Sequence, residues 1–240
     1  MVNHPRRGLV HPLRLCCQIG FIGQHIHGAN QMLRYIYGHD LHKHPKLADT
    51  MFKDRAWQFK ERLGWDVTVT NGRERDEYDD LNPLYVIWEL PDGSHGGSMR
   101  LLPTTGRTMV SDHFSHIGDG VTIESPLIWE CTRFCLSPRS DGRTAAALML
   151  AGGDVLQGFG LMSYVGVFDA RMERIYRAIG AEPEILGSEG KGRDKISIGL
   201  WHFTRDDQAK VAKRAGLSRP LAKLWFERAF GHTIDMAAVA

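Results

Sequence analysis

The sequence has few cysteines and no long hydrophobic run. Its four cysteines stand as Cys16–Cys17 and Cys131–Cys135, neither of which is a C-x-x-C motif or a disulfide framework. A reducing, cytoplasmic setting is therefore expected. No apolar stretch is long enough to span a bilayer, and the formal net charge of +2 is too small to indicate binding to nucleic acid. We therefore expect neither a membrane nor a nucleic acid among the partners.

Acidic residues are absent from residues 1–31, where no helical or alternating pattern persists. The apolar stretch "LRLCCQIGFIG" follows two arginines, so a targeting peptide is one interpretation. However, two further histidines follow, and no small-residue cleavage site is evident. We favour a disordered N-terminal extension over residues 1–31 and a folded domain over residues 32–240.

The remainder of the sequence alternates between strand-like and helix-like patterns. Its hydrophobic content of 42% and its length of 240 residues suit one globular domain. Strands are predicted at about residues 32–38, 84–90, 97–103, 127–136, 161–168 and 195–203. Helices are predicted at about residues 45–64, 144–160, 169–180, 206–215 and 218–229. This order predicts an α/β domain with helices packed on a mixed sheet.

A run of acids at residues 74–80, "ERDEYDD", interrupts this pattern. Five like charges in seven positions repel one another, so the run is either a solvated loop or lies against positive charge. The hairpin predicted after it brings Arg100 back toward the acids, and a buried arginine needs anionic partners. The run is therefore a candidate binding segment.

Glu130 lies at the centre of a predicted strand, where an ionisable carboxylate is costly unless it is paired or functional. Strict alternation places Glu130, Thr132 and Phe134 on one face of the strand and Arg133 on the other. A bulge would be needed to bring Glu130 and Arg133 together. The residues alone leave both a salt bridge and a proton acceptor open.

Five segments occur in the order seen in the acyl-homoserine-lactone synthases, namely "FKDRAWQFKERLGWDV", "ERDEYDD", "GGSMRLLP", "ECTRF" and "ARMERIYRAIG". Between about Met32 and Phe203 the chain thus resembles the LuxI-type autoinducer synthases. The resemblance implies a single-domain αβα sandwich like that of the N-acetyltransferases. It also implies acyl transfer from acyl-carrier protein or acyl-CoA to the amine of S-adenosyl-L-methionine, with lactonisation releasing methylthioadenosine. S-adenosylmethionine is then a consumed substrate, and no cofactor or metal is expected.

The resemblance assigns S-adenosylmethionine binding to two arginines, two aromatic residues and two acids. A guanidinium suits the substrate's carboxylate, and an aromatic face suits its sulfonium. These residues are Arg55, Phe59, Trp65, Asp76, Asp79 and Arg100. The remaining acids of the run, Glu74, Glu77 and Asp80, are expected to face solvent.

The resemblance also assigns catalytic residues. It implies that Glu130 deprotonates the amine through a water, because an ammonium group is not nucleophilic until it loses a proton. Arg133 is assigned to the cluster of acids and arginines. Thr132 is open to two interpretations: it holds a water or the thioester carbonyl, or it is an ordinary strand residue.

Three further groups of residues are assigned to the acyl donor. Arg139, Gly142, Arg143 and Thr144 approximate the R-x-x-G-x-G/A loop with which acetyltransferases hold phosphate at a helix N-terminus, although an ordinary turn is also possible. Arg171, Arg174 and Arg177 form a basic stripe at three-residue spacing that could dock an acidic carrier protein, with Glu173 weakening it. The predicted acyl pocket contains Phe168, Leu148, Met149 and Met162.

Phe168 aligns with the strand end at which family members that prefer 3-oxo chains tend to have threonine. Because a phenyl ring has no hydrogen-bond donor, we expect unsubstituted or 3-hydroxy acyl products and little 3-oxo product. The alternative is that Phe168 is a core residue and the acyl tunnel runs elsewhere.

Two other functions remain open: an N-acyltransferase that uses acyl-CoA on another amine, and a non-catalytic S-adenosylmethionine-binding protein. The histidines of "HDLHKHP" and "DHFSH" lack the i, i+4 helical spacing of a zinc pair, so we expect solvated histidines rather than a metal site.

Overall fold

The computed structural model describes residues 31–118, 120 and 122–231, so the predicted N-terminal extension lies almost entirely outside the described residues. A seven-stranded sheet has the order β1-β4-β5-β6-β7-β9-β8. Its strands are β1 Met32–Tyr37, β4 Leu84–Glu89, β5 His95–Pro103, β6 Ile128–Leu136, β7 Ser163–Asp169, β8 Glu184–Glu189 and β9 Ile196–Trp201. Only β6 and β7 pair in parallel, so the sheet is mixed, as predicted.

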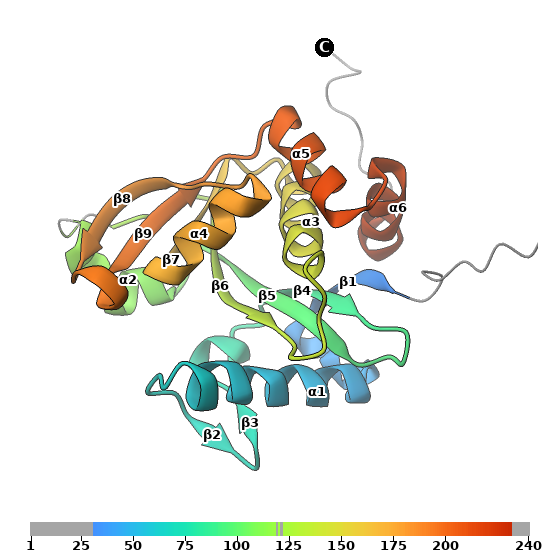
Figure 1. Cartoon of the computed structure of the whole chain (residues 1–240), viewed down its shortest axis with the longest axis horizontal. Helices are drawn as coiled ribbons and strands as arrows, with labels where there is room; N and C mark the ends of the chain where they lie inside the picture. Colours follow the sequence, from blue (N-terminus) through green and yellow to red (C-terminus); the bar gives the residue numbers. More distant parts are fainter. Residues whose placement is uncertain (1–30, 119, 121, 232–240) are drawn as a thin grey trace, which may run out of the picture.

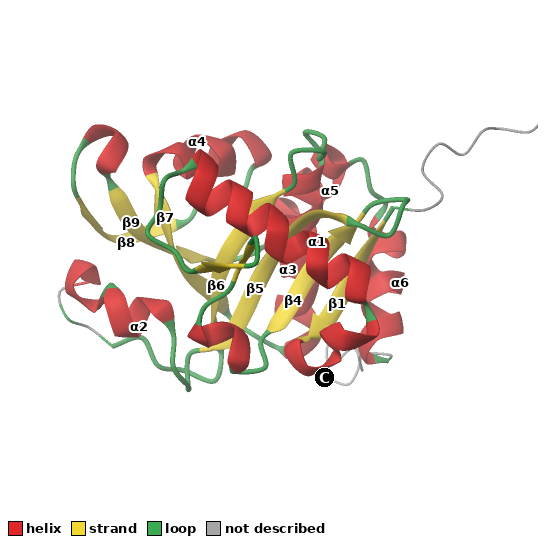
Figure 2. Ribbon diagram, turned by 90° about the horizontal axis from the view of Figure 1, so that it is seen from below, coloured by secondary structure: helices red, strands yellow, loops and turns green. Residues whose placement is uncertain are grey.

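Helices cover both faces of this sheet (Figures 1 and 2). They are α1 Pro45–Arg55, α2 Met109–His113, α3 Thr144–Phe159, α4 Ala170–Ile179, α5 Arg205–Ala215 and α6 Arg219–Phe230. Helices α3 to α6 pack on one face and enclose the largest apolar cluster. Helices α1 and α2 lie on the other face over two smaller clusters. The predicted αβα sandwich is therefore confirmed.

Helix α1 continues as a π-helix over Ala56–Arg62, a change of winding that the sequence pattern did not predict. The chain leaves this helix at Gly64, whose φ of 69° favours glycine. A short hairpin follows, with β2 Val69–Thr70 paired to β3 Arg73–Glu74. Its turn residues Asn71 and Gly72 both have positive φ, as a type I′ turn requires. The hairpin leads directly into the acidic run.

Two irregularities in the sheet shape the region between α1 and α2. Strands β6 and β7 form only three residue pairs, from Ile128↔Ser163 to Glu130↔Val165. Beyond Glu130 no further pair joins them, so the sheet splits there. A bulge also interrupts the pairing of β6 with β5, because two residues of β6, Arg133 and Phe134, together oppose Met99 of β5. Arg133 has a φ of 52°.

Candidate active site

The acidic run is ordered first by its own backbone. Asp76 caps a 3-10 helix over Glu77–Asp80, and its carboxylate accepts hydrogen bonds from the backbone N–H groups of Tyr78 and Asp79. The Asp79 carboxylate in turn accepts from the N–H of Asp76, at 3.0 Å. This reciprocal capping box fixes the positions of two carboxylates before any arginine approaches them.

Arg55, the last residue of α1, binds two of the acids. Its Nε donates to Glu74 at 2.6 Å, and its two terminal nitrogens donate to the two oxygens of Asp79, each at 2.9 Å. The hydroxyl of Tyr85 also donates to Asp79, at 2.5 Å. Burial alone would raise the pKa of Asp79, but Arg55 and Arg100 outweigh it and hold that pKa well below its usual range.

Arg100 and Arg133 complete the cluster from the sheet. Arg100 on β5 binds Asp76 through both terminal nitrogens and reaches Asp79 at 2.9 Å. Arg133 on β6 donates to Glu74 at 3.0 Å and contacts Asp76 at 2.6 Å. Each acid thus lies between two arginines. We call this closed and electrically neutral set the arginine–carboxylate ring; its members are Arg55, Glu74, Arg133, Asp76, Arg100 and Asp79.

Only one side of the ring is accessible. The side chains of Asp76 and Arg133 are 12% and 8% exposed, whereas those of the other four members are at most 1% exposed. The expectation that Glu74 faces solvent is therefore wrong, because the β2–β3 hairpin turns it inward between Arg55 and Arg133. Glu77 and Asp80 are exposed, as expected.

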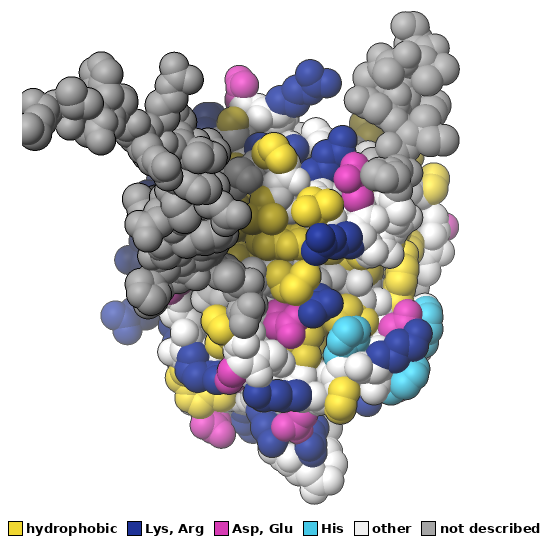
Figure 3. Space-filling view, turned by 90° about the vertical axis from the view of Figure 1, so that its right-hand side faces the viewer, with side chains coloured by type: hydrophobic (Ala, Val, Ile, Leu, Met, Phe, Trp, Pro, Cys, Tyr) yellow, Lys and Arg dark blue, Asp and Glu magenta, His cyan; other side chains and the backbone are white. Residues whose placement is uncertain are grey.

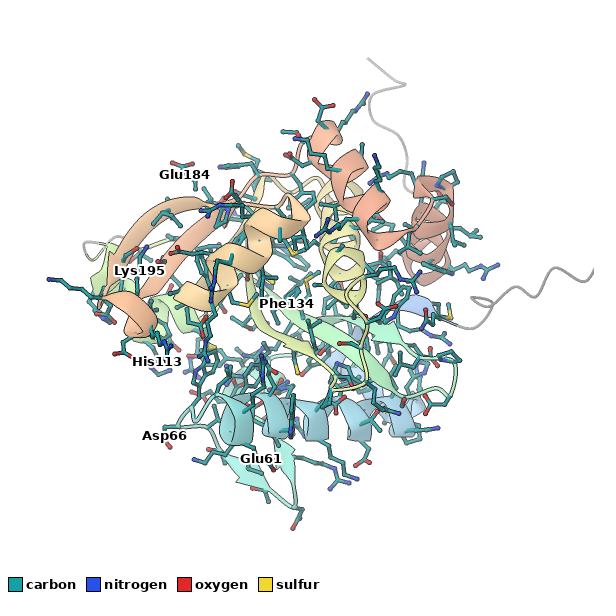
Figure 4. The ribbon with its side chains drawn as sticks, viewed as in Figure 1. Glu61, Asp66, His113, Phe134, Glu184 and Lys195 are labelled. Carbon is teal, nitrogen blue, oxygen red and sulfur yellow. The ribbon has the colours of Figure 1, made fainter. Side chains whose placement is uncertain are left out.

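The bulge in β6 explains how Arg133 joins the ring. Strict alternation placed Arg133 on the opposite face from Glu130 and Phe134, and this prediction is wrong for both residues. The extra residue turns Arg133 toward α1 and α2, while Phe134 packs edge-on against Tyr176 of α4 on the other face (Figure 4). The structure describes no salt bridge between Glu130 and Arg133. The bulge therefore places Arg133 among the acids of the ring.

An aromatic stack adjoins the accessible side of the ring. Trp65 stacks on Phe59 with ring centroids 5.1 Å apart and planes 9° from parallel. The guanidinium carbon of Arg133 lies 5.5 Å from the Phe59 ring centroid. Phe59 is buried, but Trp65 is 37% exposed. The predicted Phe59 and Trp65 thus lie together beside the predicted arginines and acids, and Trp65 offers an open aromatic face.

Glu130 is fully buried at the point where β6 and β7 separate. Its two carboxylate oxygens accept hydrogen bonds from the backbone N–H groups of Val110 at 2.7 Å and Met109 at 3.1 Å. Burial raises the pKa of Glu130 to about 7, and those two hydrogen bonds only partly oppose the rise. Each oxygen can still accept another hydrogen bond. A carboxylate that titrates near neutral pH is well suited to accept a proton.

Met109 connects Glu130 to the ring, and Thr132 contacts the ring from the same strand as Glu130. The Thr132 hydroxyl accepts a hydrogen bond from Nε of Arg100 at 3.0 Å. The Met109 sulfur lies 3.3 Å from a terminal nitrogen of Arg133 and 3.8 Å from one of Arg100. No motif in the sequence marked Met109 as a site residue, although Thr108 before it is a recognisable N-cap.

The residues predicted to hold phosphopantetheine cluster at the N-terminus of α3, but their charges are already paired. Arg139 binds Asp92 at 3.3 Å and Ser94 at 2.8 Å, and so ties this loop to the β4–β5 turn. Arg143 pairs with Asp141 at 2.8 Å. Gly142 is open, since a Cβ there would meet nothing within 4 Å, whereas Thr144 is buried.

Three of the four predicted acyl-pocket residues are buried in the apolar cluster beneath α3 and α4. Phe168 packs edge-on against Tyr176 at 5.4 Å, and Leu148 and Met149 belong to the same cluster. Met162 does not line a buried pocket, because it is 63% exposed at the start of β7. Its backbone N–H donates to Leu127, and its side chain extends into solvent.

The three arginines of the predicted docking stripe are all exposed on α4, but their environments differ. Arg171 pairs with Asp169 at 2.8 Å, and Arg177 pairs with Glu182 at 2.6 Å. Arg174 has no hydrogen-bond or ion-pair partner among the residues that the structure describes. It is therefore the member of the stripe whose charge is most available.

Within residues 31–118, 120 and 122–231, no group of three or more histidine, cysteine or acidic side chains could hold a metal ion. Asp112 of "DHFSH" instead accepts hydrogen bonds from Tyr78 and Arg107. In the same part of the chain, no helix is long and apolar enough to cross a membrane.

Comparison with known proteins identifies the family of this chain. Residues 38–212 match the family model described as autoinducer synthase. An acyl-homoserine-lactone synthase of Rhizobium etli is 40% identical over 197 residues, which cover 79% of this chain and 92% of the relative. The crystal structure of the AHL synthase LasI is 26% identical, with a TM-score of 0.67 and coverage of 76% and 95%.

A structure of the CoA-dependent acyl-homoserine lactone synthase BjaI with SAM and isopentyl-CoA shares the fold. It is 24% identical, with a TM-score of 0.69 and coverage of 78% of this chain and 90% of that one. The family match spans every member of the arginine–carboxylate ring and Glu130. The chain therefore belongs to the autoinducer synthase family, the acyl-homoserine-lactone synthases.

Proposed function

We propose that the accessible side of the arginine–carboxylate ring binds S-adenosyl-L-methionine and that Glu130 accepts the proton from its amine. The observation that carries this proposal is the position of Glu130. It is a buried carboxylate with a pKa of about 7, linked through Met109 to a neutral ring whose accessible members are one acid and one arginine.

The substrate's charges match this arrangement. Its ammonium group suits Asp76, its carboxylate suits Arg133, and its sulfonium suits the open face of Trp65. Because the ring is neutral as a whole, it favours a ligand that carries both signs of charge over a simple cation or anion. The four fully buried members hold Asp76 and Arg133 in place, so little rearrangement is needed on binding.

The chemistry then follows from one proton transfer. Glu130, directly or through a water, takes a proton from the substrate's ammonium group, and the free amine attacks the thioester carbonyl carbon. The carbon–sulfur bond of the thioester breaks, and the thiol of the acyl carrier leaves. The carboxylate of the acylated substrate next attacks its own γ-carbon. That carbon–sulfur bond breaks in turn, so methylthioadenosine leaves and the lactone closes.

The acyl donor is proposed to approach between α3 and α4, where β6 and β7 separate. Arg174, which has no charge partner among the described residues, offers a positive charge for an acidic carrier protein on this side. The loop of Arg139, Gly142, Arg143 and Thr144 lies at the N-terminus of α3, whose amides would attract a phosphate. The cluster of Phe168, Leu148 and Met149 supplies an apolar lining for the acyl chain.

Mass spectrometry of the products tests the proposal. Purified chain would be incubated with S-adenosylmethionine and, in parallel reactions, with acyl-CoA or acylated carrier protein of matched chain length. We expect an acyl-homoserine lactone and methylthioadenosine in equal amounts, with unsubstituted or 3-hydroxy chains preferred because Phe168 offers no donor to a 3-oxo group. Acylation without methylthioadenosine release would instead favour an N-acyltransferase, and a dominant 3-oxo product would contradict the assignment of Phe168.

A further inference from the structure

A second buried polar group lies under α1, outside the arginine–carboxylate ring. His95, the first residue of β5, is fully buried between Asp54 and Ser98. Its Nδ1 lies 2.7 Å from a carboxylate oxygen of Asp54, and its Nε2 lies 2.9 Å from the hydroxyl of Ser98. The backbone N–H of His95 also donates to the Thr50 hydroxyl at 2.9 Å. The group therefore joins α1 to β5.

The partners of His95 determine its tautomer. A carboxylate can only accept a hydrogen bond, so Nδ1 must carry the proton. Burial lowers the pKa of His95, and Asp54 offsets this only in part. The imidazole of His95 is thus neutral, and its Nε2 accepts a hydrogen bond from the Ser98 hydroxyl. Ser98 thus donates a hydrogen bond to His95, and His95 donates one to Asp54. This hydrogen-bond series has the same order as in serine hydrolases.

Ser98 is nevertheless no nucleophile for an external substrate. It is only 2% exposed, and it lies on β5 beneath α1. Its proton is held by a neutral, buried imidazole whose own partner is a side chain of the same interface. The function of the hydrogen-bond series must therefore lie in the parts of α1 and β5 that it holds in place.

Each end of this hydrogen-bond series lies next to an arginine of the arginine–carboxylate ring. Asp54 immediately precedes Arg55 on α1, and Ser98 precedes Arg100 by two residues on the same face of β5. Arg55 is also the last α-helical residue before the winding changes to the π-helix that carries Phe59. The hydrogen-bond series thus anchors α1 at the point where a small rotation of the helix would move Arg55.

We propose that Asp54, His95 and Ser98 form a positioning relay that sets Arg55 and Arg100 for S-adenosylmethionine binding. This inference rests on the proposed function of the ring. None of the three residues touches the substrate. The relay acts through the two buried arginines, which in turn hold Asp76 in place for the substrate and Asp79 beneath it. Its loss is expected to weaken binding of S-adenosylmethionine much more than binding of the acyl donor.

The test compares variants of the full chain by steady-state kinetics at a temperature well below the lowest Tm. Asp54→Ala and His95→Phe break the relay, whereas Asp54→Asn keeps an acceptor for Nδ1–H. We expect the first two to raise KM for S-adenosylmethionine about tenfold or more, since small displacements of binding groups have large effects. KM for the acyl donor should stay within about twofold, and Asp54→Asn should remain close to the parent chain.

Thr50→Val is the matched control, because between α1 and β5 it removes only the hydrogen bond from the His95 backbone N–H to α1, one turn before Asp54, and leaves the side-chain contacts among Asp54, His95 and Ser98 in place. It should lower Tm comparably but leave KM for S-adenosylmethionine unchanged. Equal effects of Thr50→Val and Asp54→Ala on that KM would show general loosening and overturn the relay, as would an unchanged KM in Asp54→Ala. If the larger changes prevent folding, Ser98→Ala supplies the same comparison with an expected rise of about two- to fivefold.

The parent chain in the same assay separates this inference from the proposed function. If the parent releases no lactone, the proposed function fails, and calorimetric binding of S-adenosylmethionine to parent and variants then tests the relay alone. Nitrogen-15 NMR of the histidine side chains gives a second readout. We expect a neutral His95 imidazole that is protonated at Nδ1. An imidazole protonated at Nε2, or at both nitrogens, would contradict the relay.

Discussion

Two buried sites in this domain each bring an aspartate together with arginine and tyrosine side chains, yet their charges are paired very differently. In the arginine–carboxylate ring, Asp79 accepts four side-chain hydrogen bonds, from Arg55, Arg100 and Tyr85. At the junction of β1, α3 and α6, Asp154 forms one ion pair within the described part of the chain, with Arg219 at 3.5 Å. Its other carboxylate oxygen has no hydrogen-bond partner among the described residues.

The two aspartates consequently titrate in opposite directions. Arginine contacts hold the pKa of Asp79 below its usual range despite burial, whereas burial raises the pKa of Asp154 to about 6. The hydroxyl of Tyr35 at the junction also lacks a hydrogen-bond partner among the described residues, unlike that of Tyr85, which donates to Asp79 of the ring. Burial alone therefore does not fix the charge of an acid; the number and geometry of its partners do.

The sites also differ in their place in the family match. The ring lies within residues 38–212, whereas α6, which carries Arg219, lies beyond them. Figure 3 views the side of the molecule that carries α6, where hydrophobic side chains gather at the surface. Leu221 and Leu224 of α6 are 38% and 40% exposed. Apolar contacts of Trp225 and Phe226 with the main core, rather than the poorly satisfied polar group, hold α6 in place.

Glu130 stands between these two extremes, and changing it should have the largest effect. Among the described residues it has two backbone donors and no hydrogen-bonded or ion-paired arginine, so burial leaves its pKa near 7 even though the nearby charge of Arg100 lowers it. We expect Glu130→Gln to lower kcat by about 10²- to 10⁴-fold, the usual contribution of a general base. Affinity for S-adenosylmethionine, measured by calorimetry, should change little.

The pH dependence gives a second check on Glu130. A base must be ionised to act, so kcat/KM should rise with pH through about 7 and level off above it. The Gln variant should lose this rise. Near-normal turnover in Glu130→Gln, or a rise that persists in it, would show that another group accepts the proton.

Breaking the ring should cost the most stability. Asp79→Asn leaves Arg55 and Arg100 buried with one fewer anion, so we expect a loss of about 3–5 kcal/mol in the free energy of unfolding. Urea denaturation at pH 7 measures it. Glu77→Gln is the control, because it removes an exposed acid of the same run and should change stability by less than about 0.5 kcal/mol. Equal losses in the two variants would mean that the ring has no special contribution to stability.

The same aspartate-to-asparagine change at the junction should have the opposite sign. The folded-state pKa of Asp154 lies above its ordinary value of 3.8, so ionisation favours the unfolded state. The penalty is absent below about pH 4 and grows as the pH rises through about 6. We expect Asp154→Asn to stabilise the protein by about 1–3 kcal/mol at pH 8, with the gain vanishing toward pH 4. Destabilisation at pH 8 would show that the pair with Arg219 outweighs desolvation.

The sequence predicted most of the fold, because the main helices and strands carry strong apolar periodicity. It missed β8, in which five of six residues are exposed and no apolar alternation marks a face. The motifs located five of the six ring members but not the burial of Glu74. That burial depends on Arg55 and Arg133, which lie 19 and 59 residues away in the chain.

The wrong prediction for the face of Arg133 and the unpredicted contact of His95 have the same physical origin. Alternation along a strand assumes a regular ladder, and one inserted residue at the bulge reverses the faces of Arg133 and Phe134. The contact of His95 with Asp54 spans 41 residues and follows no local pattern. Local sequence thus predicts elements well, whereas the pairing of buried charges is decided by tertiary packing.

The smallest expected effect concerns Arg174, an exposed arginine that lies outside both the ring and the junction. Arg174 is exposed and has no charge partner among the described residues, so its field acts mainly through solvent. If α4 docks an acidic carrier protein, Arg174→Glu should raise KM for the acylated carrier by a few-fold at low salt and less at 0.5 M salt. KM for S-adenosylmethionine and for acyl-CoA should not change. Arg228→Glu on α6 makes the same charge change at an exposed site elsewhere (Figure 1). A carrier KM that is unchanged in Arg174→Glu, or raised equally in Arg228→Glu, would show that α4 does not dock the carrier.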